Sequence, residues 1–434
     1  MSFLPTKPNF VAAWANASFL AEFPVVDTAR ANNFSYAWYN CSGLSSFPVL
    51  NTTFGTDFSH AWRGCYGLTT FPALNTGFGV NFTSAWQECC GLASFPSLSV
   101  SSGTDFSQAW YNCWGLTSFP ALSASSGTNF SYAWYGCYGL TSFGAVNTSS
   151  GEYFSYSWAN CYGLTSFPSL DVSAGIEFSG TWQGCSGLTS FPTLDVSAGF
   201  TFANTWYDCS GLTSFPGLDV SSGTQFGGAW YNCSSLSSFP SLDTSAGTDF
   251  SYAWYGCSSL TSFPSLDVAS GSYFSYAWYG CANLTSFPSL DVSSGNDFSY
   301  AWQDCSGLTS FPGLDTSAGT NFTGTWQGCS SLTSFPSISV NNGLDFGYAW
   351  EGCGAMTSFP ANFFDSCAGV YFGSAFNNCA LDQTSVDNIL VSLDYAGQSN
   401  GYLDITGGTS AAPSGTGASA ASSLAGKGWT VNTN

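Results

Sequence analysis

The chain has 434 residues, of which 18% are aromatic and only 7% are charged. Four basic residues stand against 25 acidic ones, and the formal net charge is -21. Nucleic acids and anionic membranes both attract clustered cations, so we expect neither nucleic acid nor a membrane surface as a partner. No run of 18 or more apolar residues occurs, so no membrane insertion is predicted.

Residues 1–9 precede the first repeat and include Pro5 and Pro8. They form no module that could cover the first coil, and an uncovered coil edge is prone to pair with another chain. We therefore expect residues 1–9 to be an N-terminal docking segment for another protein or for a second copy of this chain. The first residues also lack a continuous apolar core, so we expect synthesis in the cytoplasm without a signal peptide.

Residues 10–380 repeat one unit of 24 residues about sixteen times. Tryptophan recurs at this spacing from Trp14 to Trp350, and the last unit has Phe376 in its place. Cysteine follows the same spacing from Cys41 to Cys353, and the odd total of 17 cysteines argues against paired disulfides. A unit this small cannot bury its aromatic side chains alone, so stacking of the units into one solenoid is predicted.

Within one unit, Phe250, Ala253, Trp254 and Cys257 are spaced like residues on one face of a short helix. Pro264 has no N–H for a strand ladder, so a short parallel strand is expected beside it, near the sequence LTSF or LDVS. The predicted fold class is a repeat solenoid that is leucine-rich-repeat-like, with a short parallel strand plus a short helical turn in each 24-residue coil.

Residues 381–434 differ from the repeats and are expected to form a C-terminal capping module. Apolar residues recur at helical spacing over 386–393, after an N-cap candidate at Thr384 or Ser385. Residues 401–408 predict a strand, 414–428 a second helix of small residues, and 429–434 a final strand. Because a solenoid needs an end that hides its last open core, a small α+β cap is predicted.

One column of the repeat carries carboxylates. Its members occupy the same place in seven consecutive coils: Asp171, Asp195, Asp219, Asp243, Asp267, Asp291 and Asp315. Earlier coils have Asn or Ser there, and all three residue types can accept a hydrogen bond from the backbone two residues on. A turn-forming role is therefore the preferred interpretation, although a linear series of carboxylates could also bind Ca²⁺. No other cofactor or metal is expected.

Catalytic residues are not predicted. Glycoside hydrolysis needs two carboxylates in different environments, which equivalent positions do not provide. His60 is the only histidine, and it stands where other coils have Tyr. We therefore expect the protein not to be an enzyme.

Two columns vary against the nearly fixed core, namely the residue two before each Trp and the residue directly after it. Tyrosine is frequent in both, and the ligand-contact candidates are Tyr36, Tyr39, Tyr132, Tyr135, Tyr252, Tyr255, Tyr276, Tyr279 and Tyr300. Tyrosine offers contact area at a low cost in conformational entropy. A face that is merely solvated, or packed on its neighbours, stays the open alternative.

The repeat resembles that of BspA-like leucine-rich-repeat surface proteins. That family's unit has a D-T-S box, an aromatic residue after a small one, and C-x-x-L, which correspond here to Asp243, Thr244, Ser245, Ala253, Trp254, Cys257 and Leu260. The resemblance covers residues 10–379, with Trp where Phe is usual and an additional Phe-Pro step. It implies a leucine-rich-repeat-like solenoid and a role in adhesion on bacterial surfaces or in bacteriophages.

Together with the missing secretory signal, the resemblance favours a phage-type member on a virion or another extracellular surface. We expect a non-catalytic adhesion or receptor-binding protein that presents its Tyr-rich face to a host surface glycan or protein. The partner at the N-terminal end would be another virion protein or a second copy. The alternatives are a structural subunit that assembles end to end into a filament or lattice, and a polysaccharide-degrading enzyme.

Overall fold

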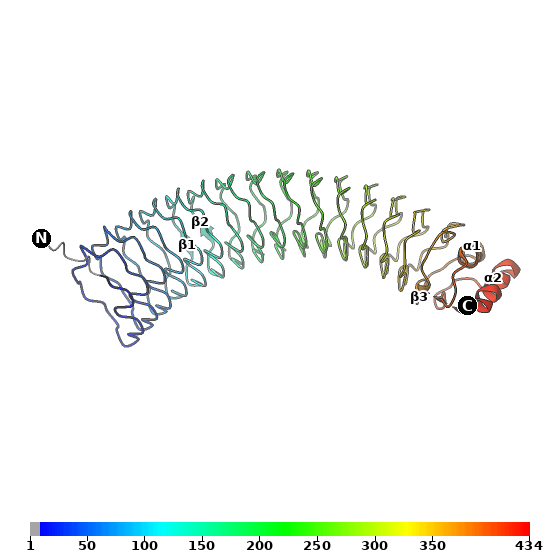
Figure 1. Ribbon diagram of the computed structural model, residues 1–434, viewed down its shortest axis with the longest axis horizontal. Coiled ribbons are helices and arrows are strands. Elements are labelled where there is room, and N and C mark those ends of the chain that lie inside the picture. Colours follow the sequence, from blue (N-terminus) through cyan, green and yellow to red (C-terminus); the bar gives the residue numbers. More distant parts are fainter. Residues whose placement is uncertain (1–8) are drawn as a thin grey trace, which may run out of the picture. The chain divides into compact units, whose positions relative to one another are not determined.

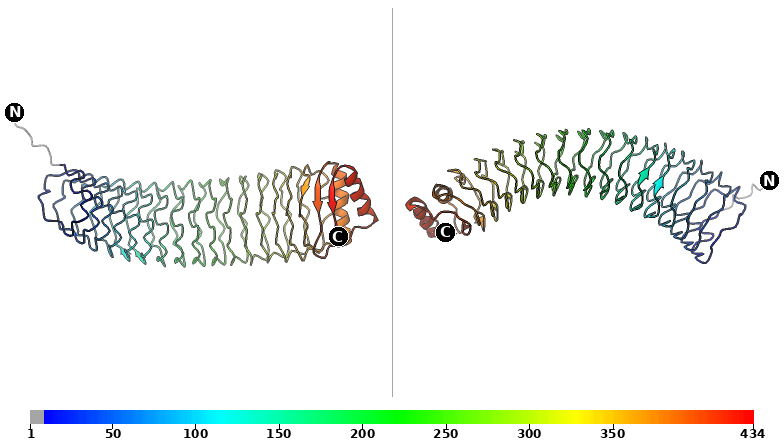
Figure 2. Two further views of the ribbon diagram at one scale, coloured as in Figure 1. Left: turned by 90° about the horizontal axis from the view of Figure 1, so that it is seen from below. Right: turned by 180° about the vertical axis from the view of Figure 1, so that it is seen from behind.

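The computed structural model describes residues 9–434 (Figure 1). The predicted docking segment 1–9 lies outside this range except for its last residue. The chain divides into two compact units, Met1–Leu212 with Leu218–Val220 and Thr213–Gly217 with Ser221–Asn434. Within each unit, successive 24-residue coils lie side by side (Figures 1 and 2).

The segment around each tryptophan is a series of turns and not the helical turn that the spacing predicted. Backbone N–H groups there donate alternately to the next coil and within their own coil. The N–H of Tyr252 donates to the carbonyl of Ser275 at 2.9 Å, and the N–H of Ala253 donates to that of Phe250 at 3.0 Å. A helix would send every N–H to the carbonyl four residues back, so the helical prediction was wrong.

Left-handed backbone occurs twice in each of these turn series. In one coil, φ is 59° at Tyr252, two residues before the tryptophan, and 67° at Gly256, two residues after it. Glycine adopts this conformation without steric penalty, and Asn and Asp tolerate it better than other residues. Gly, Asn and Asp are frequent directly before the cysteine. They therefore indicate, from the sequence alone, where the second left-handed residue of each turn series lies.

Strands in the coils are short and parallel. β1 (Ser118–Phe119) pairs with β2 (Ser142–Phe143), and other coils are joined by single bridges such as Asp249 with Tyr273. β2 is followed by Gly144, whose N–H donates to the Phe119 carbonyl at 2.8 Å. The other repeats have proline there, which cannot make this bond. The strand expected near LTSF is thus confirmed in these two coils.

The core of each unit is built from aromatic rings that repeat from coil to coil. Trp254 and Trp278 are fully buried and stack with centroids 5.5 Å apart and an interplanar angle of 6°. Phe263 meets Trp254 edge-on at 4.9 Å. The Sγ of Cys281 donates to the Trp254 carbonyl at 3.3 Å, and the cysteines are all buried thiols. The repeated Trp and Cys are therefore structural.

The second unit ends in an α/β segment. Its elements in order are β3 (Tyr371–Phe372), α1 (Gln383–Ala396), β4 (Tyr402–Asp404), α2 (Gly415–Gly426) and β5 (Thr430–Asn432). The strands form a parallel sheet in the order β3-β4-β5, with the helices as crossover connections (Figure 2). The helices and strands predicted over 381–434 are present, but this topology is α/β and not the predicted α+β.

The first helix begins slightly earlier than predicted. Its N-cap is Asp382, and not Thr384 or Ser385, because the Asp382 side chain accepts the hydrogen bond of the Ser385 N–H. Phe372 in the last coil stacks on Phe346 at 4.9 Å and on Trp429 at 6.1 Å. The aromatic core therefore continues into the α/β segment. Across residues 9–434, no helix is both long enough and apolar enough to cross a membrane.

Candidate binding surface

Six tyrosines of the second unit form two parallel rows, named here the paired tyrosine rows: Tyr252, Tyr276 and Tyr300 in the first, and Tyr231, Tyr255 and Tyr279 in the second. In the first row, successive ring centroids are 4.7 and 4.8 Å apart. In the second row they are 4.4 and 4.5 Å apart, with interplanar angles of 3° and 2°. The structure thus brings together five of the predicted contact tyrosines and adds Tyr231.

The two rows touch each other along their length. Tyr252 and Tyr255 have centroids 6.1 Å apart, and Tyr276 and Tyr279 have centroids 5.9 Å apart, each pair in a tilted arrangement. Because the rings within a row cover one another's faces, solvent meets mainly ring edges and hydroxyl groups. Tyr252 is 40% exposed. The rows therefore offer a band of phenol hydroxyls and ring edges and not a set of open ring faces.

The tyrosines of the first row have a left-handed backbone conformation. Tyr252, Tyr276 and Tyr300 have φ of 59°, 58° and 57°, which costs about 1–2 kcal/mol for an L-residue. Stacking of two rings contributes about 0.5–1.5 kcal/mol, an amount comparable to the backbone cost. Other coils have glycine in this column, at Gly180, Gly228 and Gly324. The coil does not require tyrosine here.

The first row ends at Gly324. A Cβ at this position would collide with the ring of Tyr300, so the absence of a side chain leaves room for that ring to lie over the Gly324 backbone. The coil that follows Tyr300 therefore extends the row's surface with backbone instead of a further ring.

In the first unit, Tyr132 and Tyr135 belong to a smaller cluster of the same kind. Tyr132 stacks on Tyr156 at 5.0 Å, and Tyr111 stacks on Tyr135 at 4.9 Å. The two stacks meet where the centroids of Tyr132 and Tyr135 lie 5.8 Å apart. Tyr111 and Tyr156 were not among the predicted contact residues, although both lie in the columns that the sequence singled out.

Tyr36 and Tyr39 form a third and different group. Tyr36 stacks on His60 at 4.5 Å, and the guanidinium carbon of Arg63 lies 5.8 Å from the ring centroid of Tyr39. Burial and the neighbouring Arg63 lower the pKa of His60, so its imidazole is neutral at pH 7. Here an imidazole and a guanidinium of the chain itself pack against the two tyrosine rings.

The second row ends beside a polar depression of about 290 Å³. Its lining residues are Gln303, Asp304, Gln327, Gly328, Glu351, Gly352 and Asn378. The Nε2 of Gln327 donates to the Glu351 carboxylate at 2.6 Å. Burial, and then the Asp304 carboxylate, raise the pKa of Tyr279 to about 12. Its hydroxyl therefore stays protonated at neutral pH and can both donate and accept hydrogen bonds.

The predicted carboxylate column forms turns. Six of its members, Asp171, Asp195, Asp243, Asp267, Asp291 and Asp315, accept a hydrogen bond from the N–H two residues on. At Asp291, the hydroxyl and N–H of Ser293 donate at 2.6 and 3.0 Å, and these bonds lower its pKa. The turn-forming interpretation agrees with this geometry.

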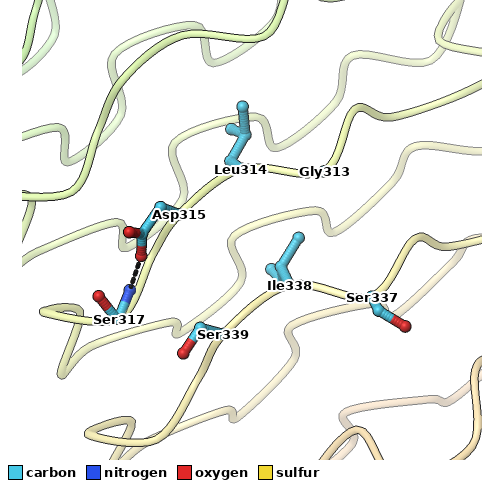
Figure 3. Close-up of a pocket in the computed structure, with 7 residues that line it drawn as sticks. All are labelled: Gly313, Leu314, Asp315, Ser317, Ser337, Ile338 and Ser339. Carbon is cyan, nitrogen blue, oxygen red and sulfur yellow. Dashed lines mark hydrogen bonds between the residues drawn. The ribbon is translucent and has the colours of Figure 1, made fainter.

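A shallow depression of about 610 Å³ lies beside the last member of that column (Figure 3). It is lined by Gly313, Leu314, Asp315, Ser317, Ser337, Ile338 and Ser339. Asp315 is the only carboxylate among them, and it faces the Ser317 N–H at 3.0 Å. In the described part of the chain, no three His, Cys, Asp or Glu side chains are grouped so that they could hold a metal ion.

Sequence reasoning missed a third aromatic column, four residues after the tryptophan in the first unit. It contains Tyr66, Trp114, Tyr138 and Tyr162, and their side chains are exposed. The signal is visible in the sequence, because C-W-G-L and C-Y-G-L stand where most coils have C-S-G-L or C-S-S-L.

Comparison with known proteins gives matches among solved structures only. No protein-family model matches the sequence, and no curated protein does. A leucine-rich repeat protein from Bacteroides ovatus is similar over 78% of this chain and 91% of its own, at 16% identity and a TM-score of 0.48. An internalin from Listeria monocytogenes is similar over 81% and 82%, at 13% identity and a TM-score of 0.24.

The plant peptide hormone receptor RGFR1, solved in complex with RGF2, is similar over 96% of this chain and 83% of its own. The identity is 12% and the TM-score is 0.23. All three neighbours are less than 20% identical to this chain.

Proposed function

We propose that this protein is a non-catalytic adhesion or receptor-binding protein that presents the paired tyrosine rows to a host surface glycan or protein. One observation carries the proposal. Tyrosine is placed on left-handed backbone in consecutive coils, although glycine occupies the same column elsewhere in the repeat. Since folding does not demand these rings, a contact role accounts for them.

The chemistry of the rows suits recognition. Tyrosine combines apolar ring area with a hydroxyl and has few rotatable bonds, so little entropy is lost when a partner is bound. The adjoining carboxamides and carboxylates of Gln303, Asp304 and Gln327 supply hydrogen-bond donors and acceptors beside the rings. A partner with many hydroxyl or amide groups would match this surface.

The proposed setting is a virion or another extracellular surface. The resemblance of the repeat to BspA-like proteins supports this setting, and a phage particle is the finer form of the proposal. In this setting the α/β segment would act as the cap of the solenoid, because its Trp429 stacks on Phe372 in the last coil.

A second candidate is a subunit that assembles end to end. In the first described coil, Phe19 is 88% exposed, whereas the next two coils have glycine in its place, at Gly43 and Gly67. Exposed apolar side chains of this size favour burial against a partner. Residues of another virion protein or of a second copy could cover them and produce a filament or lattice.

Retention of the purified chain on immobilised bacterial envelopes and on a printed array of glycans and envelope proteins tests the proposal. We expect saturable retention of dispersed protein and no release of reducing sugar from polysaccharides. Absence of retention on every surface would contradict the adhesion role. Rods that lengthen with protein concentration in electron micrographs would favour the second candidate, and reducing sugar in the assay would favour an enzyme.

A further inference from the structure

The aromatic residues four positions after the tryptophan in the first unit form a local exception to the repeat. We name Tyr66, Trp114, Tyr138 and Tyr162 the outer aromatic column. Other coils have small residues in this column, namely Ser18, Ser42, Ser186, Ser210, Ser234, Ser258, Ala282, Ser306, Ser330 and Gly354. Because coils form with a small residue at this position, the large rings are not needed for folding.

The rings of this column face solvent. Trp114 is 51% exposed, and across residues 9–434 it is the one tryptophan with an exposed side chain. Tyr66, Tyr138 and Tyr162 are between 42% and 48% exposed. Contiguous exposed aromatic side chains on a soluble protein mark an interaction site more often than single ones do.

The column has stacked rings at one end and an interruption at the other. Tyr138 and Tyr162 stack with centroids 5.3 Å apart. Between Tyr66 and Trp114 the column holds Cys90, whose thiol is directed at the backbone carbonyls of Glu88 and Asn112, at 3.2 and 3.3 Å. Tyr66 and Trp114 are thus two coils apart, roughly 10 Å at the usual strand spacing, with no ring between them in the column.

A carboxylate lies beside this interruption. The Tyr66 hydroxyl donates to the Glu88 Oε2 at 3.3 Å, and the Gln87 Nε2 lies 3.5 Å from the Glu88 Oε1. Each carboxylate oxygen can accept a further hydrogen bond. Glu88 has φ of 63° in a column where Gly, Asn and Asp are usual, so its long side chain is a second exception at the same place.

We propose that the outer aromatic column is a carbohydrate subsite. One pyranose ring of a saccharide chain packs its C–H face on Trp114, and the hydroxyl groups of the same chain donate hydrogen bonds to the Glu88 carboxylate beside Tyr66. A pyranose has an apolar face and hydroxylated edges, which match a column of exposed rings with a carboxylate bonded to one of them, Tyr66. This subsite is a second contact surface, in the first unit, whereas the paired tyrosine rows belong to the second. It rests on the proposed adhesion function and names a glycan as ligand.

Charge restricts the class of glycan. Glu88 and the net charge of -21 repel carboxylated and sulfated sugars. The ligand class is therefore a neutral polysaccharide, and acidic polysaccharides are excluded. A protein partner on the same rings is the competing outcome of the test.

Affinity electrophoresis in soluble neutral polysaccharides (a β-glucan, a mannan and a galactan) and acidic ones (hyaluronan and alginate) tests the subsite. We expect at least one neutral polysaccharide to retard the wild type and to shift its tryptophan emission. Trp114→Ser installs the residue that eight other coils have in this column. It should weaken retardation at least about tenfold, a loss of about 1.4 kcal/mol in binding free energy.

 Serine already occupies this column in the next coil after Tyr162, at Ser186, so the variant should fold. Ser186→Ala, in the same column but three coils from Trp114, should bind like the wild type and serves as the matched control.

Equal retardation of the wild type and Trp114→Ser would overturn the subsite, as would binding of the acidic polysaccharides alone. Capture of an envelope protein that depends on Trp114 would also overturn it in favour of a protein partner. If no polysaccharide binds while the wild type is still retained on envelopes through the paired tyrosine rows, the subsite fails and the adhesion function stands. If the wild type is retained on none of the surfaces, the proposed adhesion function is contradicted as well.

Discussion

The N–H of Gly144 donates a hydrogen bond to the carbonyl of Phe119 at 2.8 Å. Gly144 follows Phe143 at the position where the other coils have proline after phenylalanine. This bond accompanies the pairing of β1 with β2. Elsewhere proline removes the donor and the ladder shrinks to single bridges. Proline in the repeat thus limits how far the strands extend.

Gly144→Pro should remove the β1–β2 pairing and leave the coils intact. Loss of one buried backbone hydrogen bond costs about 0.5–1.5 kcal/mol, and the local backbone must also move, because a Cβ at Gly144 would meet Pro120 and Ala121. We expect a lower urea midpoint with an unchanged circular dichroism spectrum. Gly217→Ala, where a Cβ meets nothing within 4 Å, is the control. A Gly144→Pro protein as stable as the wild type would contradict this role.

Tyr252→Gly should change the free energy of unfolding by no more than about 1 kcal/mol. The variant loses ring stacking, worth about 0.5–1.5 kcal/mol, but relieves the left-handed backbone of Tyr252, worth about 1–2 kcal/mol. Tyr252→Ala loses the ring without that relief and should be the less stable of the two. Chemical denaturation of both variants measures the difference, and the reverse order of stability would show that backbone strain is absent at this position.

The sequence predicts the period, the buried Trp and Cys columns and the two helices of the C-terminal segment, because each follows from regular spacing. The turn series around Trp254 was mistaken for a helix, since the spacing of Phe250, Ala253 and Cys257 fits both. Gly256 and its equivalents before each cysteine carry the signal for left-handed backbone. Whether Tyr252 and Tyr276 stack depends on side-chain directions, which the spacing alone does not give.

Asp291→Ala should lower the thermal midpoint at pH 7. The bonds from Ser293 lower the pKa of Asp291 below its usual value of 3.8, so the ionised carboxylate is favoured by folding. This contribution is present above pH 4 and is lost as the pH falls through the lowered pKa. The midpoints of the wild type and the variant should therefore converge in acid. A difference that persists at low pH would point to another cause.

Calcium should leave the thermal midpoint unchanged. The carboxylates of Asp291 and Asp315 are directed at the Ser293 and Ser317 N–H groups of their own coils. Titration with CaCl₂ after treatment with a chelator measures this directly. A rise in the midpoint with calcium that disappears in Asp291→Ser would show that the column binds the ion.

Alkali should destabilise the protein through its buried thiols. Burial raises the pKa of Cys137 and of Cys281 to about 12, from a usual value of 9.0. The neutral thiol is favoured by folding, so this stability is complete below pH 9 and is lost as the pH rises from 9 toward 12. Each such thiol contributes about 1.4 kcal/mol per pH unit in that window.

Free energies of unfolding at pH 8 and pH 10.5 measure the effect. The difference between the two values should shrink in Cys137→Ala and in Cys281→Ala. Alanine is the residue that the first coil has in this column, at Ala17, so the substitution has a precedent in the chain. An unchanged difference in both variants would exclude the thiols as its source.

Retention of a fourfold variant on bacterial envelopes measures whether the paired tyrosine rows are the binding surface. Tyr252→Gly, Tyr276→Gly, Tyr255→Gln and Tyr279→Gln together install residues that other coils already have in these columns, as at Gly228 and Gln303. We predict that this variant unfolds close to the wild-type temperature and loses most of its retention, with any residual retention depending on Trp114. Full retention of the folded variant would contradict the claim that the paired tyrosine rows are the binding surface.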